Sequence, residues 1–371
     1  MSKILILYAT AGIGHKKAAF AIKEAFDKSG RQDVLLKDSL DYTNPFFKAS
    51  YNSIYLALVR YLPTLWGFFY YLLDNPWIYA VMRPIRRLVN HMNSRKLVRF
   101  LLKEKPETII VTHFFALEVI DCLKKKGILK NARLITVVTD YKSHTFWLSK
   151  YVDSYIVGSG YTRDDLVRRG IPYEKIKAFG IPCAKSFSEK RNLEPLRSKI
   201  GLAADKKTIF ILGGGFGVGP IKRIVLYLDR LEEDFQVLVV CGYNKRLYNS
   251  LMETAKNARH TFKIYGFVDN VDELMALSDV LISKSGGISV TEALNAALPM
   301  IVIDPIPGQE MRNYKFLEKH DAALKIKTPK DITGVMKKLL SSNKLDILKN
   351  NIKKISLVDS AERIVDECRM I

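Results

Sequence analysis

The chain has 371 residues, 48% of them hydrophobic, so it is long enough for two domains that each bury a core. Its formal net charge of +21 implies an anionic partner, and because no nucleic-acid-binding motif is present we expect a membrane rather than nucleic acid. The four cysteines and six histidines lack disulfide or metal-ligand spacing, so we expect a reducing compartment and no metal site.

The beginning of the chain predicts a βαβ unit: a strand at 3–8, a helix at 16–29 and a strand at 34–36. It lacks the long apolar core of a signal peptide, so we expect a cytoplasmic protein. The loop before the helix contains two glycines, but the G-x-G-x-x-G dinucleotide pattern would need a third glycine where Lys17 stands. A nicotinamide-dependent oxidoreductase is therefore kept only as an alternative function.

Residues 42–80 interrupt the α/β pattern and hold a third of the aromatic residues of the chain. Residues 54–73 are long enough to span a bilayer, but Arg60 and Pro63 lie inside them, and the tryptophan and tyrosine content is typical of a membrane interface. We therefore predict helical segments that dip into the headgroup layer. An ordinary packed helical hairpin is the alternative.

Basic residues follow, with no acidic residue between Asp74 and Glu104. Such a run favours attraction to an anionic membrane, with a solvated protein surface as the alternative. The predicted membrane-contacting residues are Tyr61, Trp66, Phe68, Phe69, Arg83, Arg86 and Arg87.

The α/β pattern then resumes, with a predicted strand at 108–112 that ends at His113 and another at 134–139 that ends at Asp140. A strand at 155–157 and a helix at 161–169 complete the first half. Residues 186–195 have the composition of a linker.

The second half predicts two strand, glycine turn and helix units. Gly213, Gly214 and Gly215 follow a strand at 208–212, and Ser285, Gly286 and Gly287 follow a strand at 280–283. Backbone N–H groups and a helix N-terminus suit a phosphate, whereas the nearby Glu292 and Glu310 suit hydroxyl groups. Because ligands of parallel sheets bind at the carboxyl ends of the strands, this combination suggests a sugar nucleotide.

Four motifs together resemble glycosyltransferase family 28, in the branch that joins monogalactosyldiacylglycerol synthases and processive diacylglycerol glucosyltransferases. They are Gly12-Ile13-Gly14-His15, Thr139 through Trp147, Gly213-Gly214-Gly215, and Ser285 through Asn313. The resemblance implies an α/β protein of GT-B architecture, with two Rossmann-like domains whose parallel sheets face each other across a cleft. It places an acceptor domain at 1–187, a UDP-sugar domain at 188–354, and a helix at 355–371 that returns to the first domain.

The same resemblance implies residue roles. The donor-binding set is Gly213, Gly214, Gly215, Phe267, Ser285, Gly286, Gly287, Glu292, Gln309, Glu310 and Asn313. Within it, Phe267 and its neighbour face uracil, Glu292 takes the ribose, and Gln309 and Glu310 take the hexose. The predicted acceptor-binding residues are Gly14, His113, His144 and Trp147.

The implied reaction is the transfer of glucose or galactose from UDP to diacylglycerol, with inversion, at the inner face of the cell membrane. The acceptor hydroxyl needs a base, and the candidates are His15 and Asp140. His15 is favoured because histidine ordinarily titrates near neutral pH; a phosphate contact by His15 and an orienting role for Asp140 are the alternatives. No cofactor or metal is expected. Another lipid-linked acceptor, or a membrane-binding scaffold without activity, remains open.

Overall fold

The computed structural model describes residues 3–10, 12–215 and 217–369. The chain divides into two compact units, which are treated separately. The first comprises the residues up to 184 together with 306–312 and those from 357 onward, and the second comprises 185–305 and 313–356. The sequence analysis placed residues 306–312 in the second domain, whereas the structure groups them with the first.

The first unit is built on a parallel sheet of six strands, as expected for an α/β fold. The strand order is β2-β1-β3-β4-β5-β6. The strands are β1 (Ile4–Tyr8), β2 (Val34–Asp38), β3 (Thr108–Val111), β4 (Arg133–Val137), β5 (Ser154–Ile156) and β6 (Ile176–Lys177). Because β1, β3 and β4 are neighbours and parallel, the loops after them leave the same edge of the sheet.

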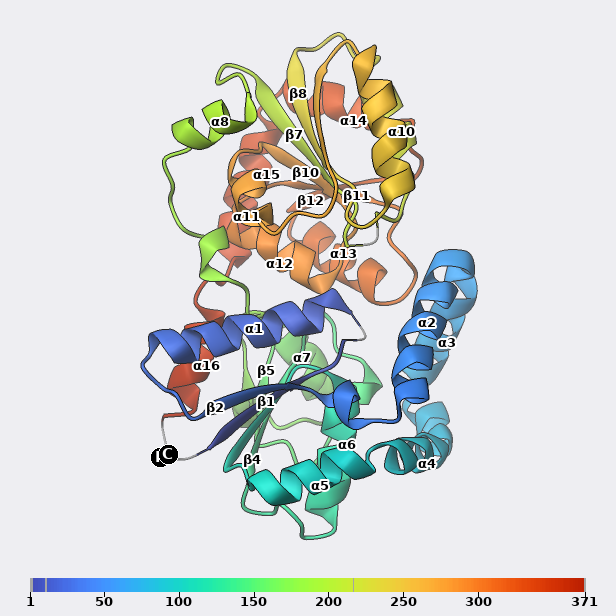
Figure 1. The fold of residues 1–371 in the computed structure, drawn as a ribbon, viewed down its shortest axis with the longest axis vertical. Coiled ribbons are helices and arrows are strands. Elements are labelled where there is room, and N and C mark those ends of the chain that lie inside the picture. The colour runs from blue at the N-terminus through green and yellow to red at the C-terminus, as the bar shows by residue number, and fades with distance from the viewer. Residues whose placement is uncertain (1–2, 11, 216, 370–371) are drawn as a thin grey trace. The chain divides into compact units, whose positions relative to one another are not determined.

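Helices cover both faces of this sheet. They are α1 (Ile13–Lys28), α5 (Arg95–Glu104), α6 (Phe114–Lys125), α7 (Gly160–Arg168) and α16 (Ser360–Glu367), with short 3₁₀ turns η1 (Ser39–Tyr42), η2 (Thr145–Trp147) and η3 (Tyr173–Lys175). Helix α16 packs beside α1 (Figure 1), and its Ile364 and Val365 enter the same buried cluster as Ile22 and Phe26 of α1. The last described helix therefore belongs to the first unit.

The aromatic segment forms three consecutive helices, α2 (Pro45–Tyr61), α3 (Pro63–Leu73) and α4 (Pro76–Asn93) (Figure 1). Each helix begins with a proline, whose fixed φ suits the first helical position. Asn44 and Asn75 cap α2 and α4 by accepting hydrogen bonds from the amides of Phe46 and Trp77, both at 2.9 Å. In the described part of the chain, no helix combines the length and the apolar character needed to cross a bilayer.

The second unit is also a parallel six-stranded sheet, in the order β12-β11-β10-β7-β8-β9. Its strands are β7 (Lys207–Leu212), β8 (Phe235–Val240), β9 (Thr261–Tyr265), β10 (Val280–Ser283), β11 (Met300–Ile303) and β12 (Ala323–Ile326). Its helices and turns are η4 (Lys185–Phe187), α8 (Glu194–Ile200), α9 (Ile221–Leu228), α10 (Lys245–Lys256), α11 (Val271–Ala276), α12 (Gly287–Asn295), α14 (Asp331–Leu340) and α15 (Lys344–Ile355). Helix α13 (Gln309–Lys319) begins in the first unit and continues in the second.

Candidate functional site

Three neighbouring strands of the first unit converge on His15. His15 lies in the first turn of α1, Thr112 follows β3, and Thr139 lies just after β4. The Nδ1–H of His15 donates to the carbonyl oxygen of Thr112 at 2.7 Å, and the hydroxyl of Thr139 lies 2.9 Å from the same nitrogen. A carbonyl oxygen can only accept, so Nδ1 carries the proton and Nε2 is left with its lone pair.

Burial lowers the pKa of His15 to about 4, although the hydrogen bond to Thr112 opposes this shift. The imidazole is therefore neutral at physiological pH and is a weak base. The sequence analysis favoured His15 because histidine ordinarily titrates near neutral pH, and that premise is wrong for this buried ring. Asp140 follows Thr139 directly and is half-buried at the same edge of the sheet.

Two of the residues predicted to bind the acceptor, His113 and His144, make hydrogen bonds that stabilise the fold. The Nδ1 atom of His113 accepts from the amide of Phe115 at 3.1 Å and caps α6. In His144, Nδ1 accepts from the amide of Phe146 at 3.2 Å, and Nε2–H donates to the carbonyl oxygen of Tyr70 at 2.9 Å. Both rings are buried, as is that of Trp147, whereas Gly14 is half-buried in the first turn of α1. Contact of these residues with an acceptor stays a prediction.

The predicted phosphate cradle lies on adjacent strands of the second unit. The glycine loop, which begins at Gly213, follows β7. Ser285 and Gly286 follow the neighbouring strand β10, and the turn at Gly242 follows β8, the other neighbour of β7. A Cβ on Gly217 would lie 2.2 Å from the carbonyl oxygen of Cys241, and the φ of Gly217 is +56°, so only glycine fits this close approach. The amide of Gly213 donates to the carbonyl oxygen of Val240 at 3.1 Å, so this amide is not available to a phosphate.

Further residues complete this cradle. The side-chain amide of Asn313 donates to the carbonyl oxygen of Ser285 at 3.0 Å and fixes the turn before α12. The N-cap residue of α12 is Gly286, which offers no side chain to the first amides of this helix, so they remain suited to an anion. The sequence analysis missed Lys284, whose Cε lies 3.9 Å from where a Cβ on Gly219 would be, which brings a positive charge to the glycine loop. Glu292 is buried in the second turn of α12.

An exposed aromatic pair marks the predicted uracil position. Phe267 follows β9, and its ring stacks on that of Tyr243 with centroids 4.5 Å apart and planes 11° apart. The amide of Tyr243 donates to the carbonyl oxygen of Gly215 at 2.9 Å, which ties the pair to the glycine loop. Tyr243 was missed because a single tyrosine in a predicted turn carries no pattern.

The predicted hexose residues Gln309 and Glu310 group with the first unit, unlike the rest of the donor-binding set. Both lie in the first turn of α13 and are half-buried. One carboxylate oxygen of Glu310 accepts from the amide of Ile306 at 2.9 Å, so this side chain shapes the preceding turn.

Three arginines on α4 that are predicted to contact a membrane form ion pairs within the first unit. Arg86 pairs with Glu118 of α6 at 2.7 Å, and Arg87 and Arg83 pair with Asp121 at 2.7 and 3.5 Å. Two carboxylates thus pair with three guanidinium groups, which keep 22–38% of their side-chain surface exposed. Contact of these arginines with a membrane stays a prediction.

The outward face of α4 is apolar instead. Trp77 is 83% exposed, and six further apolar residues of α4 are exposed: Val81, Met82, Ile85, Leu88, Val89 and Met92. Of the other predicted membrane residues, Tyr61, Phe68 and Phe69 are exposed and Trp66 is half-buried. Exposed basic residues occur on the next helix, α5, at Arg95, Lys96, Arg99 and Lys103.

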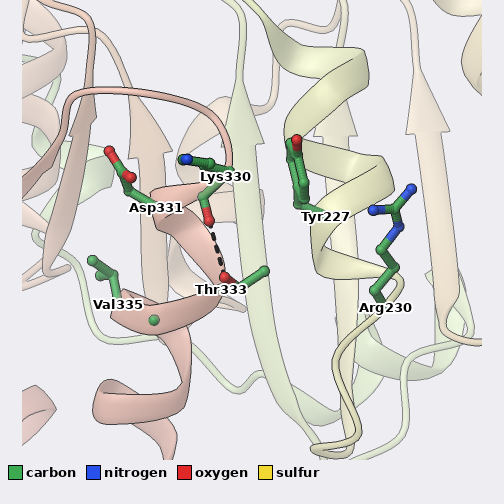
Figure 2. Close-up of a pocket in the computed structure, with 7 residues that line it drawn as sticks. Tyr227, Arg230, Lys330, Asp331, Thr333 and Val335 are labelled. Atoms are coloured by element: carbon green, nitrogen blue, oxygen red, sulfur yellow. Dashed lines mark hydrogen bonds between the residues drawn. The ribbon is translucent and has the colours of Figure 1, made fainter.

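A hollow of about 660 Å³ lies between α9 and α14 of the second unit (Figure 2). Its lining includes Tyr227, Arg230, Lys330 and Asp331, and none of the predicted donor-binding residues. Asp331 accepts from the amides of Thr328 and Lys327 at 2.7 and 3.1 Å and so caps its own helix. This hollow is separate from the predicted site. Across residues 3–10, 12–215 and 217–369, no group of three or more metal-binding side chains is assembled.

Comparison with known protein families gives two matches along the chain. Residues 15–183 match the monogalactosyldiacylglycerol (MGDG) synthase family, and residues 208–364 match the glycosyltransferase family 28 C-terminal domain. Among curated proteins, the processive diacylglycerol beta-glucosyltransferases of Bacillus cereus and Bacillus mycoides are each 32% identical over 366 residues. These alignments cover 98% of this chain and 92% of each relative.

Solved structures show the same fold at lower sequence identity. The crystal structure of Acinetobacter baumannii MurG has a TM-score of 0.66 at 14% identity and covers 99% of both chains. That of Anabaena Alr3699/HepE in complex with UDP-glucose has a TM-score of 0.57 at 13% identity and covers 100% of both chains. The predicted α/β class with two Rossmann-like units is confirmed.

Proposed function

Because the chain belongs to the branch of glycosyltransferase family 28 that joins MGDG synthases and processive diacylglycerol beta-glucosyltransferases, we propose that it transfers a hexose from a UDP-sugar to diacylglycerol. The donor is UDP-glucose or UDP-galactose. The product is a β-linked glycolipid formed by one displacement with inversion at the anomeric carbon. The observation that carries the mechanism is the 2.7 Å contact between Nδ1 of His15 and the carbonyl oxygen of Thr112, which places the lone pair of the neutral ring on Nε2.

His15 acts as the base in this proposal. The acceptor oxygen bonds to the anomeric carbon, its proton passes to Nε2, and the bond between the anomeric carbon and the diphosphate oxygen breaks with its electrons leaving on UDP. With a pKa of about 4, His15 takes the proton only after bonding to the anomeric carbon has made the hydroxyl strongly acidic. Transfer to the base is therefore late in the displacement.

The second unit holds the nucleotide. The first amides of α12 and the charge of Lys284 face the diphosphate and stabilise the negative charge that develops on the leaving UDP. The stacked pair of Tyr243 and Phe267 offers an exposed aromatic surface to the uracil ring. These groups need no divalent ion to stabilise the leaving group.

The same proposal places the enzyme at the cytoplasmic face of the cell membrane. The supporting observation is the apolar outward face of α4, followed by four exposed basic residues on α5. An apolar face inserts at the boundary of headgroups and acyl chains, and each nearby basic residue adds about 1 kcal/mol of attraction to anionic lipid.

The direct test incubates the full chain with vesicles that contain diacylglycerol and with either UDP-glucose or UDP-galactose. We expect a glycolipid product with at least one donor, UDP released in equal amount, and a transfer rate lower by about 10² to 10⁴ in a His15→Asn variant. Folded protein that forms no glycolipid with either donor would contradict the proposal. A melting temperature raised by UDP and unchanged by NADH would separate it from an oxidoreductase.

A further inference from the structure

Helix α3 holds the segment 306–312 along one of its faces. Gly67, Tyr70, Tyr71 and Asp74 are spaced i, i+3, i+4 and i+7, so they form a single stripe along α3 and its C-cap. A Cβ on Gly67 would lie 2.4 Å from the Cβ of Pro307, which means that the helix and the segment touch at this point. The hydroxyl of Tyr71 lies 3.3 Å from the amide of Gly308, which donates to it.

An ion pair closes the far end of this stripe. The guanidinium of Arg312 donates to the carboxylate of Asp74, and the two side chains are only 9% and 8% exposed. Arg312 also donates to the carbonyl oxygen of Ser143 at 3.1 Å and lies over the ring of Tyr70, 4.9 Å from its centroid. The planar guanidinium is thus fixed by a charge, a carbonyl and an aromatic face.

Asp74 is itself held in place. Arg169 donates to both of its carboxylate oxygens at 2.9 Å, and the amide of Thr145 donates at 2.8 Å. Burial opposes ionisation, but the hydrogen bonds from Arg169 and Arg312 and the charge of Arg312 hold the pKa of Asp74 well below its ordinary value. Asp74 is therefore a fixed anion to which Arg312 is attached.

The segment between Pro307 and Arg312 contains Gln309 and Glu310, the predicted hexose-binding residues. It is pinned at both ends, by Gly67 and Tyr71 at the start and by Asp74 at the end. We propose that α3 positions the donor hexose through this segment, with Arg312 as a positioning residue for Gln309 and Glu310. The inference rests on the proposed function and adds to it a determinant of sugar binding on a helix that holds no predicted donor-binding residue.

The test separates binding of the hexose from binding of the nucleotide. UDP and UDP-glucose are titrated by calorimetry into wild type, Gly67→Ala and Arg312→Lys, and KM and kcat are measured with diacylglycerol vesicles. Gly67→Ala adds one methyl group against Pro307 and leaves the ion pair untouched, whereas Arg312→Lys keeps the charge and loses the planar contact. Gly334→Ala in α14 is the matched control, since a Cβ there meets nothing within 4 Å.

We expect Kd for UDP to change less than twofold in both variants. KM and Kd for UDP-glucose should rise about tenfold, because a displaced segment misplaces the groups that grip the sugar. Equal weakening of UDP and UDP-glucose, or unchanged UDP-glucose binding in folded variants, would overturn the inference alone. A wild-type chain that binds UDP but not UDP-glucose or UDP-galactose would overturn the proposed function and the inference together. Should Arg312→Lys fail to fold, the Kd values of Gly67→Ala and Gly67→Ser for UDP and UDP-glucose test the inference.

Discussion

His15 and Thr112 hold each other through two hydrogen bonds. The ring Nδ1–H of His15 donates to the carbonyl oxygen of Thr112 at 2.7 Å, and the hydroxyl of Thr112 donates to the carbonyl oxygen of His15 at 2.9 Å. The first bond sets the tautomer and the second fixes the backbone that carries the ring. The first turn of α1 and the loop after β3 are thereby joined at the edge of the sheet.

Replacing His15 by Asn should lower kcat by a factor of 10² to 10⁴, the usual contribution of a positioned base. Kd for UDP should change less than twofold, because His15 lies in the first unit, whereas the predicted phosphate and uracil positions lie in the second. Steady-state kinetics and calorimetry measure the two quantities. His91→Asn, at an exposed position on α4, is the control and should match wild type. A kcat within threefold of wild type would remove His15 from the mechanism.

Stability should fall as the pH decreases from 6.5 to 4. Burial lowers the pKa values of His15 and His144 to about 4, so in this range the unfolded chain binds protons that the folded chain does not. Each ring accounts for at most about 3 kcal/mol of the lost free energy of unfolding. Urea unfolding at pH 7, 5.5 and 4.5 measures it.

His144→Asn isolates one of these contributions, because asparagine can still cap the turn that follows but does not titrate. We expect a shallower loss of unfolding free energy between pH 6.5 and 4 than in wild type. An unchanged slope would show that His144 is not kept neutral by the fold. The paired carboxylate of Asp74 acts in a different range, below pH 4, because its pKa is lowered from an ordinary value near 4.

Replacing Trp77, Ile85 and Leu88 together by Ser should weaken vesicle binding at least tenfold, because each fully buried apolar side chain contributes about 1.5–3 kcal/mol. Flotation with vesicles that contain anionic lipid measures the bound fraction. Leu226→Ser, at an exposed position of α9, is the matched control. Undiminished binding of the triple variant would remove α4 from the membrane surface.

Arg86→Met tests whether Arg86 mainly stabilises the fold or attracts the protein to a membrane. Removing one partner of the pair with Glu118 should lower the free energy of unfolding by about 2 kcal/mol, less than for a fully buried pair because Arg86 is partly exposed. The salt dependence of vesicle binding should not change. A variant with wild-type stability and a reduced salt dependence would support the membrane role predicted from the sequence.

Gly217→Ala should weaken UDP binding at least tenfold. A Cβ at this position would overlap the carbonyl oxygen of Cys241, so the glycine loop must move. Calorimetry with UDP measures the effect, and Gly334→Ala is the control. Retained UDP affinity would show that the conformation of the glycine loop does not determine nucleotide binding.

Chelation of divalent ions should leave the transfer rate unchanged within twofold. Amide groups and Lys284 are expected to stabilise the leaving UDP without an ion. The rate is compared after dialysis against EDTA and after Mg²⁺ or Mn²⁺ is restored. A loss on chelation that either ion reverses would contradict the metal-independent mechanism.

The sequence predicted most of the fold because periodic apolar runs and glycine turns are local signals. The strands β7 and β10 and the turns after them were located in this way. The edge strand β12 and helix α13 were missed, since Ala323–Ile326 is short and partly polar and two prolines and a glycine precede Gln309. The positions of His15 and Asp140 at one sheet edge followed from their place after parallel strands.

Other features of the site depend on which side of a helix faces the protein, and that is not a local property. On α4 the arginines and the apolar residues alternate with helical spacing, so either face could have been the outer one. Carboxylates on α6 decided the outcome, because Glu118 and Asp121 attract the basic face inward. The low pKa of His15 and the contact between Asp74 and Arg312 likewise come from tertiary burial.

Helix α3 has two faces with different surroundings. Gly67, Tyr70 and Tyr71 touch the segment 306–312, while Leu65, Phe68 and Phe69 are exposed on another face. The two sets share no position, so selection can act on them separately. We therefore expect substitutions at Leu65, Phe68 and Phe69 to leave the contact with the segment 306–312 intact, whereas a larger residue at Gly67 requires Pro307 to shift.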